Sequence, residues 1–80
     1  MQILVRRGEI ATNLNIPPPT IKHYIEMGLF EPASRTPRGQ LLFDFEEVFK
    51  RYEMISELKT KRLTLEEIKQ ELDKEFSSEN

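Results

Sequence analysis

The sequence NIPPPTIKHY, residues 15–24, decides how the N-terminal half of this chain folds. Asn15 follows a short amphipathic segment, residues 8–14, and asparagine tolerates the left-handed conformation that ends many helices. A residue before proline is driven out of the α region, so residues 16–18 should be extended. Pro19 is then the earliest residue that can open a second helix. Two short helices separated by a four-residue turn are typical of a helix-turn-helix.

The second predicted helix, residues 19–27, has one apolar face and one polar face. Its apolar stripe is formed at spacings of three and four by Ile21, Tyr24 and Ile25. The opposite face carries Pro19, Lys22, His23 and Glu26. This placement favours a groove-facing or simply exposed ring for His23 over a buried core histidine. The stripe makes Tyr24 at least partly a core residue, with only its hydroxyl available to a ligand.

The flanking segments predict β structure. The β-prone run at residues 3–5 is either a small strand or an N-terminal plug. Residues 29–43 are interpreted as a hairpin, which Leu29 and Phe30 enter. Its turn is residues 36–39, with proline second and glycine fourth, as a type I turn prefers.

Two more helices are predicted after the hairpin. Asp44 and Glu47 have the spacing of a capping box, and so do Thr64 and Glu67. The first helix has a long apolar stripe, Phe45, Val48, Phe49, Tyr52, Ile55 and Leu58, whose aromatic members we assign to the core. The stripe of the second is Leu65, Ile68, Leu72 and Phe76. Residues 77–80 are expected to form a disordered tail.

Composition narrows the possible functions. A chain of 80 residues with 38% hydrophobic content is one small domain, too small for a large enzyme fold. It has no cysteine and one histidine, so it has neither a disulfide framework nor a Cys/His zinc site. No apolar run is long enough for a membrane span or a signal peptide, which predicts a soluble cytoplasmic protein without membrane contact. We expect no cofactor, no metal and no catalytic residues, and the acidic pairs at residues 46–47 and 66–67 belong to helix N-termini.

The net charge of −2 by itself argues weakly against nucleic-acid binding. The charge is unevenly distributed, however. Residues 1–43 contain five basic and three acidic residues, whereas residues 44–80 contain seven basic and eleven acidic ones. A mildly basic half is therefore followed by an acidic, helix-rich half. A solvated helical surface is the alternative explanation of this asymmetry.

An ordered set of short motifs makes the comparison with a known family specific. The motifs are residues 8–11 (GEIA), 20–24 (TIKHY), 28–29 (GL), Arg35, Gly39, 42–43 (LF), 46–48 (EEV) and 63–68 (LTLEEI). In this order and spacing the chain resembles the DNA-binding domain of MerR-type transcription regulators. The resemblance covers nearly all of residues 3–72 without a gap.

The resemblance implies that the second helix is a DNA recognition helix. The family carries a basic residue followed by two tyrosines there, which correspond here to Lys22, His23 and Tyr24. It also implies binding to bacterial promoters, usually as a dimer that distorts a long spacer so that RNA polymerase can use it. Full-length members continue into a dimerisation helix and usually an effector domain. We therefore expect an excised DNA-binding domain or a small regulator, with any homodimer formed through segments outside this chain.

Besides His23, which replaces the first tyrosine, the chain departs from the family pattern at three places. Pro17 and Pro19 replace a Ser or Thr cap and an arginine, and we expect the amides of Thr20 and Ile21, with the Thr20 hydroxyl, to be free for a DNA phosphate. The alternative is a stiff turn with water on those amides. The first wing has residues 39–41 (GQL) instead of Gly-Tyr-Arg, for which Arg38 is a candidate substitute.

The third departure is Arg62, which stands where the family has glycine. With Lys59 and Lys61 it forms a basic cluster at the family's second wing, or a solvated turn.

The prediction is a mainly α, winged helix-turn-helix domain over residues 1–76, with a small β-hairpin wing and two C-terminal helices, that binds double-stranded DNA sequence-specifically. The predicted DNA-binding residues are Thr20, Lys22, His23, Tyr24, Arg35, Arg38, Lys59, Lys61 and Arg62. Two alternatives stay open: an excisionase-like protein that bends DNA, and a helical protein-interaction module whose acidic half docks a partner.

Overall fold

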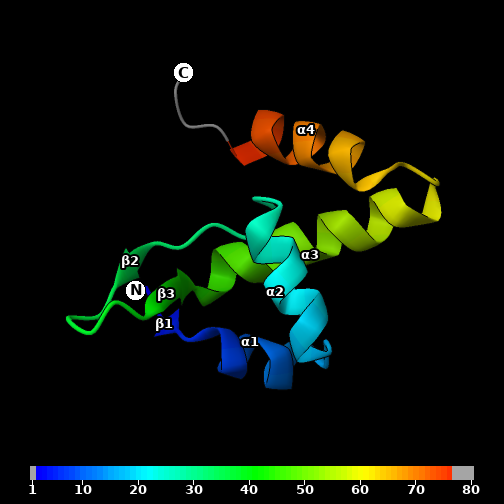
Figure 1. The fold of residues 1–80 in the computed structure, drawn as a ribbon. Coiled ribbons are helices and arrows are strands. Elements are labelled where there is room, and N and C mark those ends of the chain that lie inside the picture. The colour runs from blue at the N-terminus through cyan, green and yellow to red at the C-terminus, as the bar shows by residue number, and fades with distance from the viewer. Residues whose placement is uncertain (1, 77–80) are drawn as a thin grey trace.

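Four helices and three short strands make up the described part of the chain, residues 2–76 of a computed structural model (Figure 1). In chain order they are β1 (Leu4–Val5), α1 (Arg7–Leu14), α2 (Pro18–Glu26), β2 (Ser34–Arg35), β3 (Leu41–Asp44), α3 (Phe45–Thr60) and α4 (Leu65–Phe76). The predicted mainly α, winged helix-turn-helix fold is confirmed. The tail predicted at residues 77–80 lies outside the described residues.

The turn between α1 and α2 differs from the prediction by one residue. Asn15 ends α1 as expected, with a left-handed φ of 57° and its N–H donated to the Ala11 carbonyl. Pro17 is extended, with ψ at 139°, but α2 begins at Pro18 rather than Pro19. The avoidance of the α region before proline is a preference, and the first positions of a helix need no N–H donor. Pro18 and Pro19 therefore both fit in the first turn of α2.

The strands form one antiparallel sheet in the order β1-β3-β2. Leu4 lies opposite Asp44, and Ser34 lies opposite Leu42. The N-terminal run is thus a strand and not a plug. The predicted turn at residues 36–39 is confirmed, since the Gly39 N–H donates to the Thr36 carbonyl at 2.8 Å.

The first arm of the hairpin is shorter than predicted. Leu29 and Phe30 do not enter a strand; both are fully buried in the core. The N–H groups of both residues donate to the Tyr24 carbonyl, at 2.9 and 3.4 Å, which closes the end of α2. Gly28 makes this reversal with a φ of 81°, a conformation that favours glycine. The chain turns into the core here because two large apolar side chains follow the helix end.

Both C-terminal helices begin at capped residues. The Asp44 carboxylate accepts hydrogen bonds from two backbone N–H groups in the first turn of α3, at 3.0 and 3.4 Å. The other half of this predicted capping box is wrong, because the Glu47 carboxylate binds Arg51. In α4 the box is complete: Thr64 N–H donates to the Glu67 carboxylate at 2.9 Å, and Glu67 N–H donates to the Thr64 hydroxyl at 3.2 Å.

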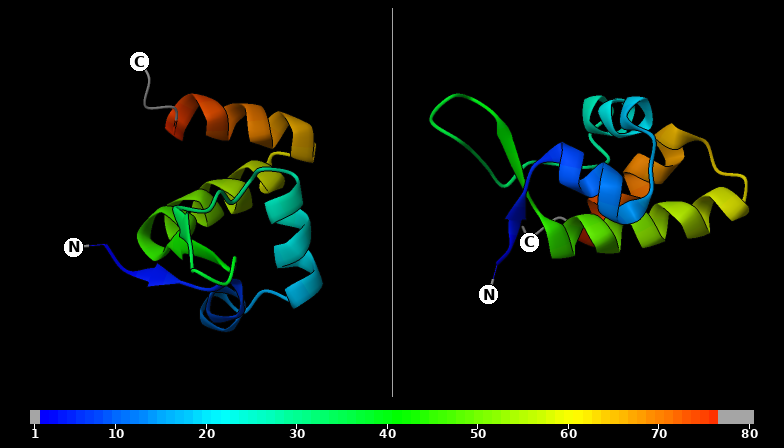
Figure 2. Two further views of the ribbon diagram at one scale, coloured as in Figure 1. Left: turned by 60° about the vertical axis from the view of Figure 1, so that its left-hand side comes forward. Right: turned by 90° about the horizontal axis from the view of Figure 1, so that it is seen from below.

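The core lies around α3, which runs between α1 and α4 (Figure 2). Every element except β2 contributes to it. Its buried apolar residues are Val5, Ile10, Ile16, Ile21, Tyr24, Leu29, Phe30, Phe43, Val48, Ile55, Ile68 and Leu72.

The buried face of α3 differs from the predicted apolar stripe. Val48, Arg51 and Ile55 are buried at spacings of three and four, whereas Phe49 is 43% exposed. Phe49 lies one residue, about 100°, around the helix from Val48. Its ring stacks on that of Phe45, with centroids 6.5 Å apart. The assignment of Phe49 to the core is therefore wrong.

Arg51 is the charged side chain that sequence patterning missed. It is only 3% exposed and its guanidinium joins three segments of the chain. One nitrogen donates to the Leu29 carbonyl after α2 at 3.1 Å, and Nε donates to the Glu47 carboxylate at 3.0 Å. Glu31 lies 3.8 Å away, and the Phe76 ring at the end of α4 lies 4.6 Å from the guanidinium carbon. The buried charge is thereby hydrogen-bonded and paired.

We expect Arg51→Ala to lower the free energy of unfolding by about 2 kcal/mol or more, because the Leu29 carbonyl loses its buried donor. The matched control is Lys50→Ala, which removes an exposed ion pair with Glu46 and should cost no more than about 0.5 kcal/mol. Urea denaturation followed by circular dichroism measures both. Equal stability of the two variants would contradict the role given to Arg51.

Candidate nucleic-acid interface

The predicted recognition helix, α2, presents its polar face outward. Ile21 and Tyr24 are 1% and 4% exposed, whereas Lys22 and His23 are exposed on the other side. Thr20 is half-buried at the first turn. The prediction that His23 is not a core histidine is confirmed.

Tyr24 is a core residue that lies at the edge of the core. Its ring meets Phe30 edge-to-face, with centroids 5.5 Å apart. Its hydroxyl accepts a hydrogen bond from Lys59 Nζ at 3.4 Å, which joins α2 to the end of α3. Any contact of Tyr24 with a ligand is therefore limited to this hydroxyl.

The start of α2 corrects the prediction that its amides are free for a phosphate. The N–H groups of Thr20 and Ile21 both donate to the Pro17 carbonyl, at 2.9 and 3.1 Å. Pro18 and Pro19 precede them in the helix and have no N–H. The start of α2 therefore has no backbone donor to offer an anion, contrary to the ordinary property of helix N-termini.

The first wing is a hairpin held by its own hydrogen bonds. Arg35 donates from its guanidinium to the Gly39 carbonyl at 3.0 Å, and the Gln40 N–H donates to the Thr36 hydroxyl at 3.1 Å. Arg38 is exposed in the turn. The wing thus carries two arginines, one lying along the hairpin and one at its tip.

The predicted basic cluster between α3 and α4 is present, but its members are engaged differently. Lys59 binds the Tyr24 hydroxyl, whereas Lys61 lies 3.8 Å from Glu57 on its own helix. Arg62 has a left-handed φ of 66°, which explains why the resembled family has glycine at this position. The turn keeps the conformation that glycine favours and adds a charge to it.

Ion pairing separates the cations of this chain into two groups. Within residues 2–76, five lysines and arginines lie within 4.0 Å of a carboxylate, all in α3, α4 or the turn between them: Lys50, Arg51, Lys61, Lys69 and Lys74. The other seven make no ion pair with a described carboxylate: Arg6, Arg7, Lys22, Arg35, Arg38, Lys59 and Arg62. Five of these seven are predicted DNA-binding residues.

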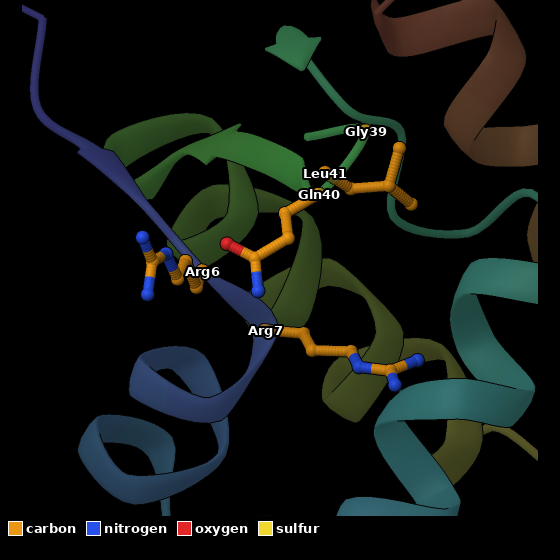
Figure 3. Close-up of a pocket in the computed structure, with 5 residues that line it drawn as sticks. All are labelled: Arg6, Arg7, Gly39, Gln40 and Leu41. Carbon is orange, nitrogen blue, oxygen red and sulfur yellow. The ribbon is translucent and has the colours of Figure 1, made fainter. Parts of the chain in front are cut away.

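Arg6 and Arg7 are the two unpaired cations that the sequence prediction did not assign to the interface. They flank the start of α1 and line a hollow with residues 39–41 of the wing (Figure 3). The signal in the sequence was two adjacent arginines just before an amphipathic helix. It was counted in the charge balance only, because their proximity to the wing depends on the pairing of β1 with β3.

Other kinds of site find no support in the described residues. No group of three His, Cys, Asp or Glu side chains within residues 2–76 is placed to hold a metal ion. None of the helices there has both the length and the apolar character needed to cross a membrane.

We expect Gly39→Ala to lower the free energy of unfolding by about 1 kcal/mol, because Gly39 has a φ of 87° and no nearby atom that a methyl group could pack against. Gly8→Ala is the control, since it also meets open space but lies in α1, where alanine is preferred. Thermal unfolding of both variants measures the difference. A Gly39→Ala variant as stable as Gly8→Ala would contradict the strain assigned to the wing turn.

Comparison with known proteins agrees with this geometry. The model of the MerR HTH family of regulatory proteins matches residues 5–75, from β1 into the last turn of α4. No curated protein and no solved structure gives a significant match. The family match contains the helix-turn-helix, the first wing and the turn between α3 and α4. The chain therefore belongs to the MerR family of helix-turn-helix regulatory proteins.

Proposed function

We propose that this chain binds double-stranded DNA sequence-specifically as a bacterial transcription regulator, or as the DNA-binding domain of one, in the cytoplasm. The observation that carries the proposal is the distribution of the unpaired cations. They lie at the start of α1, on α2, on the first wing and at the end of α3 with its following turn, which are the segments that a winged helix-turn-helix uses on DNA. The paired cations are instead on α3 and α4, apart from Lys61, which lies in the turn between them.

Each candidate residue has a role that its position allows. Thr20, Lys22 and His23 would lie at the major groove, where Lys22 would contact a phosphate at its edge. The Tyr24 hydroxyl would reach a phosphate beside them. Arg35 and Arg38 would contact the backbone from the first wing. Lys59, Lys61 and Arg62 would do so from the second wing.

Phosphate contacts should supply most of the affinity. An isolated domain with about four to six such contacts is expected to bind no more tightly than on the order of micromolar, with a strong salt dependence. A homodimer, formed through segments outside this chain, would double the contacts. Family membership supports an indirect effect on RNA polymerase at a promoter. The proposed activity is DNA binding and not catalysis.

The first experiment identifies the DNA. Selection of bound duplexes from a random pool at low salt should enrich an inverted repeat, which would give the symmetry and half-site spacing together. No enrichment would contradict sequence-specific binding and favour the protein-interaction module. A phased array of sites would favour the excisionase-like alternative.

The second experiment tests the face. We expect Lys22→Ala with Arg38→Ala to weaken duplex binding by about tenfold or more and to reduce the slope of log K against log salt by about 2, because two phosphate contacts are lost. The control is Lys50→Ala with Lys74→Ala, which removes the same charge from exposed ion pairs on α3 and α4. It should lower the affinity by less than about threefold. This small loss would come from the long-range attraction between these cations and DNA, which salt screens.

Fluorescence anisotropy at several salt concentrations measures both pairs. Unchanged affinity of the Lys22/Arg38 variant, or equal losses in the two pairs, would contradict the proposed face.

A further inference from the structure

Arg7 lines one hollow beside α2 and another beside the first wing. No motif of the sequence assigned it to the interface. It is the first residue of α1, and its exposed side chain points away from Arg6 toward α2 (Figure 3). There it lines a hollow of about 480 Å³ with Lys22. The floor is apolar or backbone and consists of Gly8, Ala11, Pro18, Pro19 and Ile21. Two cations thus share one hollow between the starts of α1 and α2.

No carboxylate lines this hollow. The nearest acidic residue along α1 is Glu9, which lines an adjacent hollow with Arg6, Arg7 and Gln40. Its carboxylate accepts the Arg6 backbone N–H at 2.8 Å and so stays at the start of α1. Among the described residues neither Arg7 nor Lys22 has an ion-pair partner. An unneutralised pair of cations over an apolar floor is complementary to an anion attached to an apolar group, such as a phosphodiester on its deoxyribose.

The neighbouring proline segment lacks the backbone N–H donors that would otherwise bind a phosphate at the start of α2. A phosphate at the start of a helix is ordinarily held by backbone N–H groups. Here Pro18 and Pro19 have none, and the next two amides are bound to the Pro17 carbonyl. The start of α2 therefore offers an anion no backbone N–H group, and Arg7 and Lys22 are the charged side chains that line the hollow.

We propose that Arg7 and Lys22 together bind one backbone phosphate of duplex DNA in this hollow, with the deoxyribose against Pro18 and Pro19. The inference rests on the proposed function and assigns it a further contact. Arg7 also lines the second hollow, with Arg6 and residues 39–41 of the wing. It therefore links the contact of the recognition helix to that of the first wing, so that one DNA strand can follow a continuous basic path.

The test uses a duplex that the intact chain has selected and four variants: Arg7→Ala, Arg7→Lys, Lys22→Ala and the control Lys74→Ala. We expect Arg7→Ala to weaken binding about tenfold, as for loss of one charge-assisted hydrogen bond, and Lys74→Ala to change it by less than about twofold. Arg7→Lys should recover part of the loss, because it keeps the charge but loses the fork geometry. Arg7→Gln replaces Arg7→Ala if circular dichroism shows that the alanine variant is unfolded.

A scan of duplexes with one neutral methylphosphonate linkage each then locates the partner. One position should weaken the wild type more than it weakens Arg7→Ala, because that variant keeps only the Lys22 contact with the phosphate. The same position should also have a reduced effect on Lys22→Ala, which keeps only the Arg7 contact. An affinity of Arg7→Ala equal to that of the wild type would overturn the inference and leave the proposed function standing. So would different partner phosphates for Arg7 and Lys22. Failure of the wild type to bind any duplex at low salt would overturn both, and would be seen before any variant is compared.

Discussion

The buried guanidinium of Arg51 constrains the arrangement of the helices. A charge removed from water is costly unless its hydrogen-bonding groups are satisfied, and a planar guanidinium is satisfied only by acceptors in fixed directions. In this fold the acceptors come from Glu47 on the same helix and from the Leu29 carbonyl after α2, while Phe76 covers one face from α4. The end of α2 and the end of α4 must therefore both lie against the middle of α3. The outward direction of the recognition helix depends on this arrangement.

Prolines at the start of α2 change which groups this helix can offer to an anion. They fit in its first turn without loss of a helical hydrogen bond, but they remove the amide donors that would otherwise attract a phosphate. The surface beside these prolines still carries positive charge, because Arg7 of α1 and Lys22 of α2 line the same hollow. The proposed DNA contact at the start of α2 therefore depends on side chains.

The net charge of this chain does not reveal how unevenly its charged residues are distributed. Net charge is −2, yet the acidic excess lies on α3 and α4. Five cations on these helices and in the turn between them are paired with carboxylates. The helix-turn-helix and the first wing hold unpaired cations in the described structure. A weak net charge combined with a locally basic face is consistent with modest DNA binding by this domain.

Local signals in the sequence determined the order and type of the elements. Asn15, the prolines, the turn at residues 36–39 and the caps at Asp44 and Thr64 act within four residues, so their effects could be read without the fold. The exposed face of α2 also followed from helical spacing alone, and with it the candidate residues Lys22 and His23.

Tertiary structure decided the features that depend on residues distant in sequence. Arg51 is buried because hydrogen-bond acceptors and an aromatic ring from other segments surround its guanidinium. Phe49 is exposed because it has no such surroundings. Arg7 joins the candidate interface because β1 pairs with β3 and α1 packs on α2. Periodicity specifies which residues share a face of one helix, but the partners of a charge are specified only when the segments that carry them are packed together.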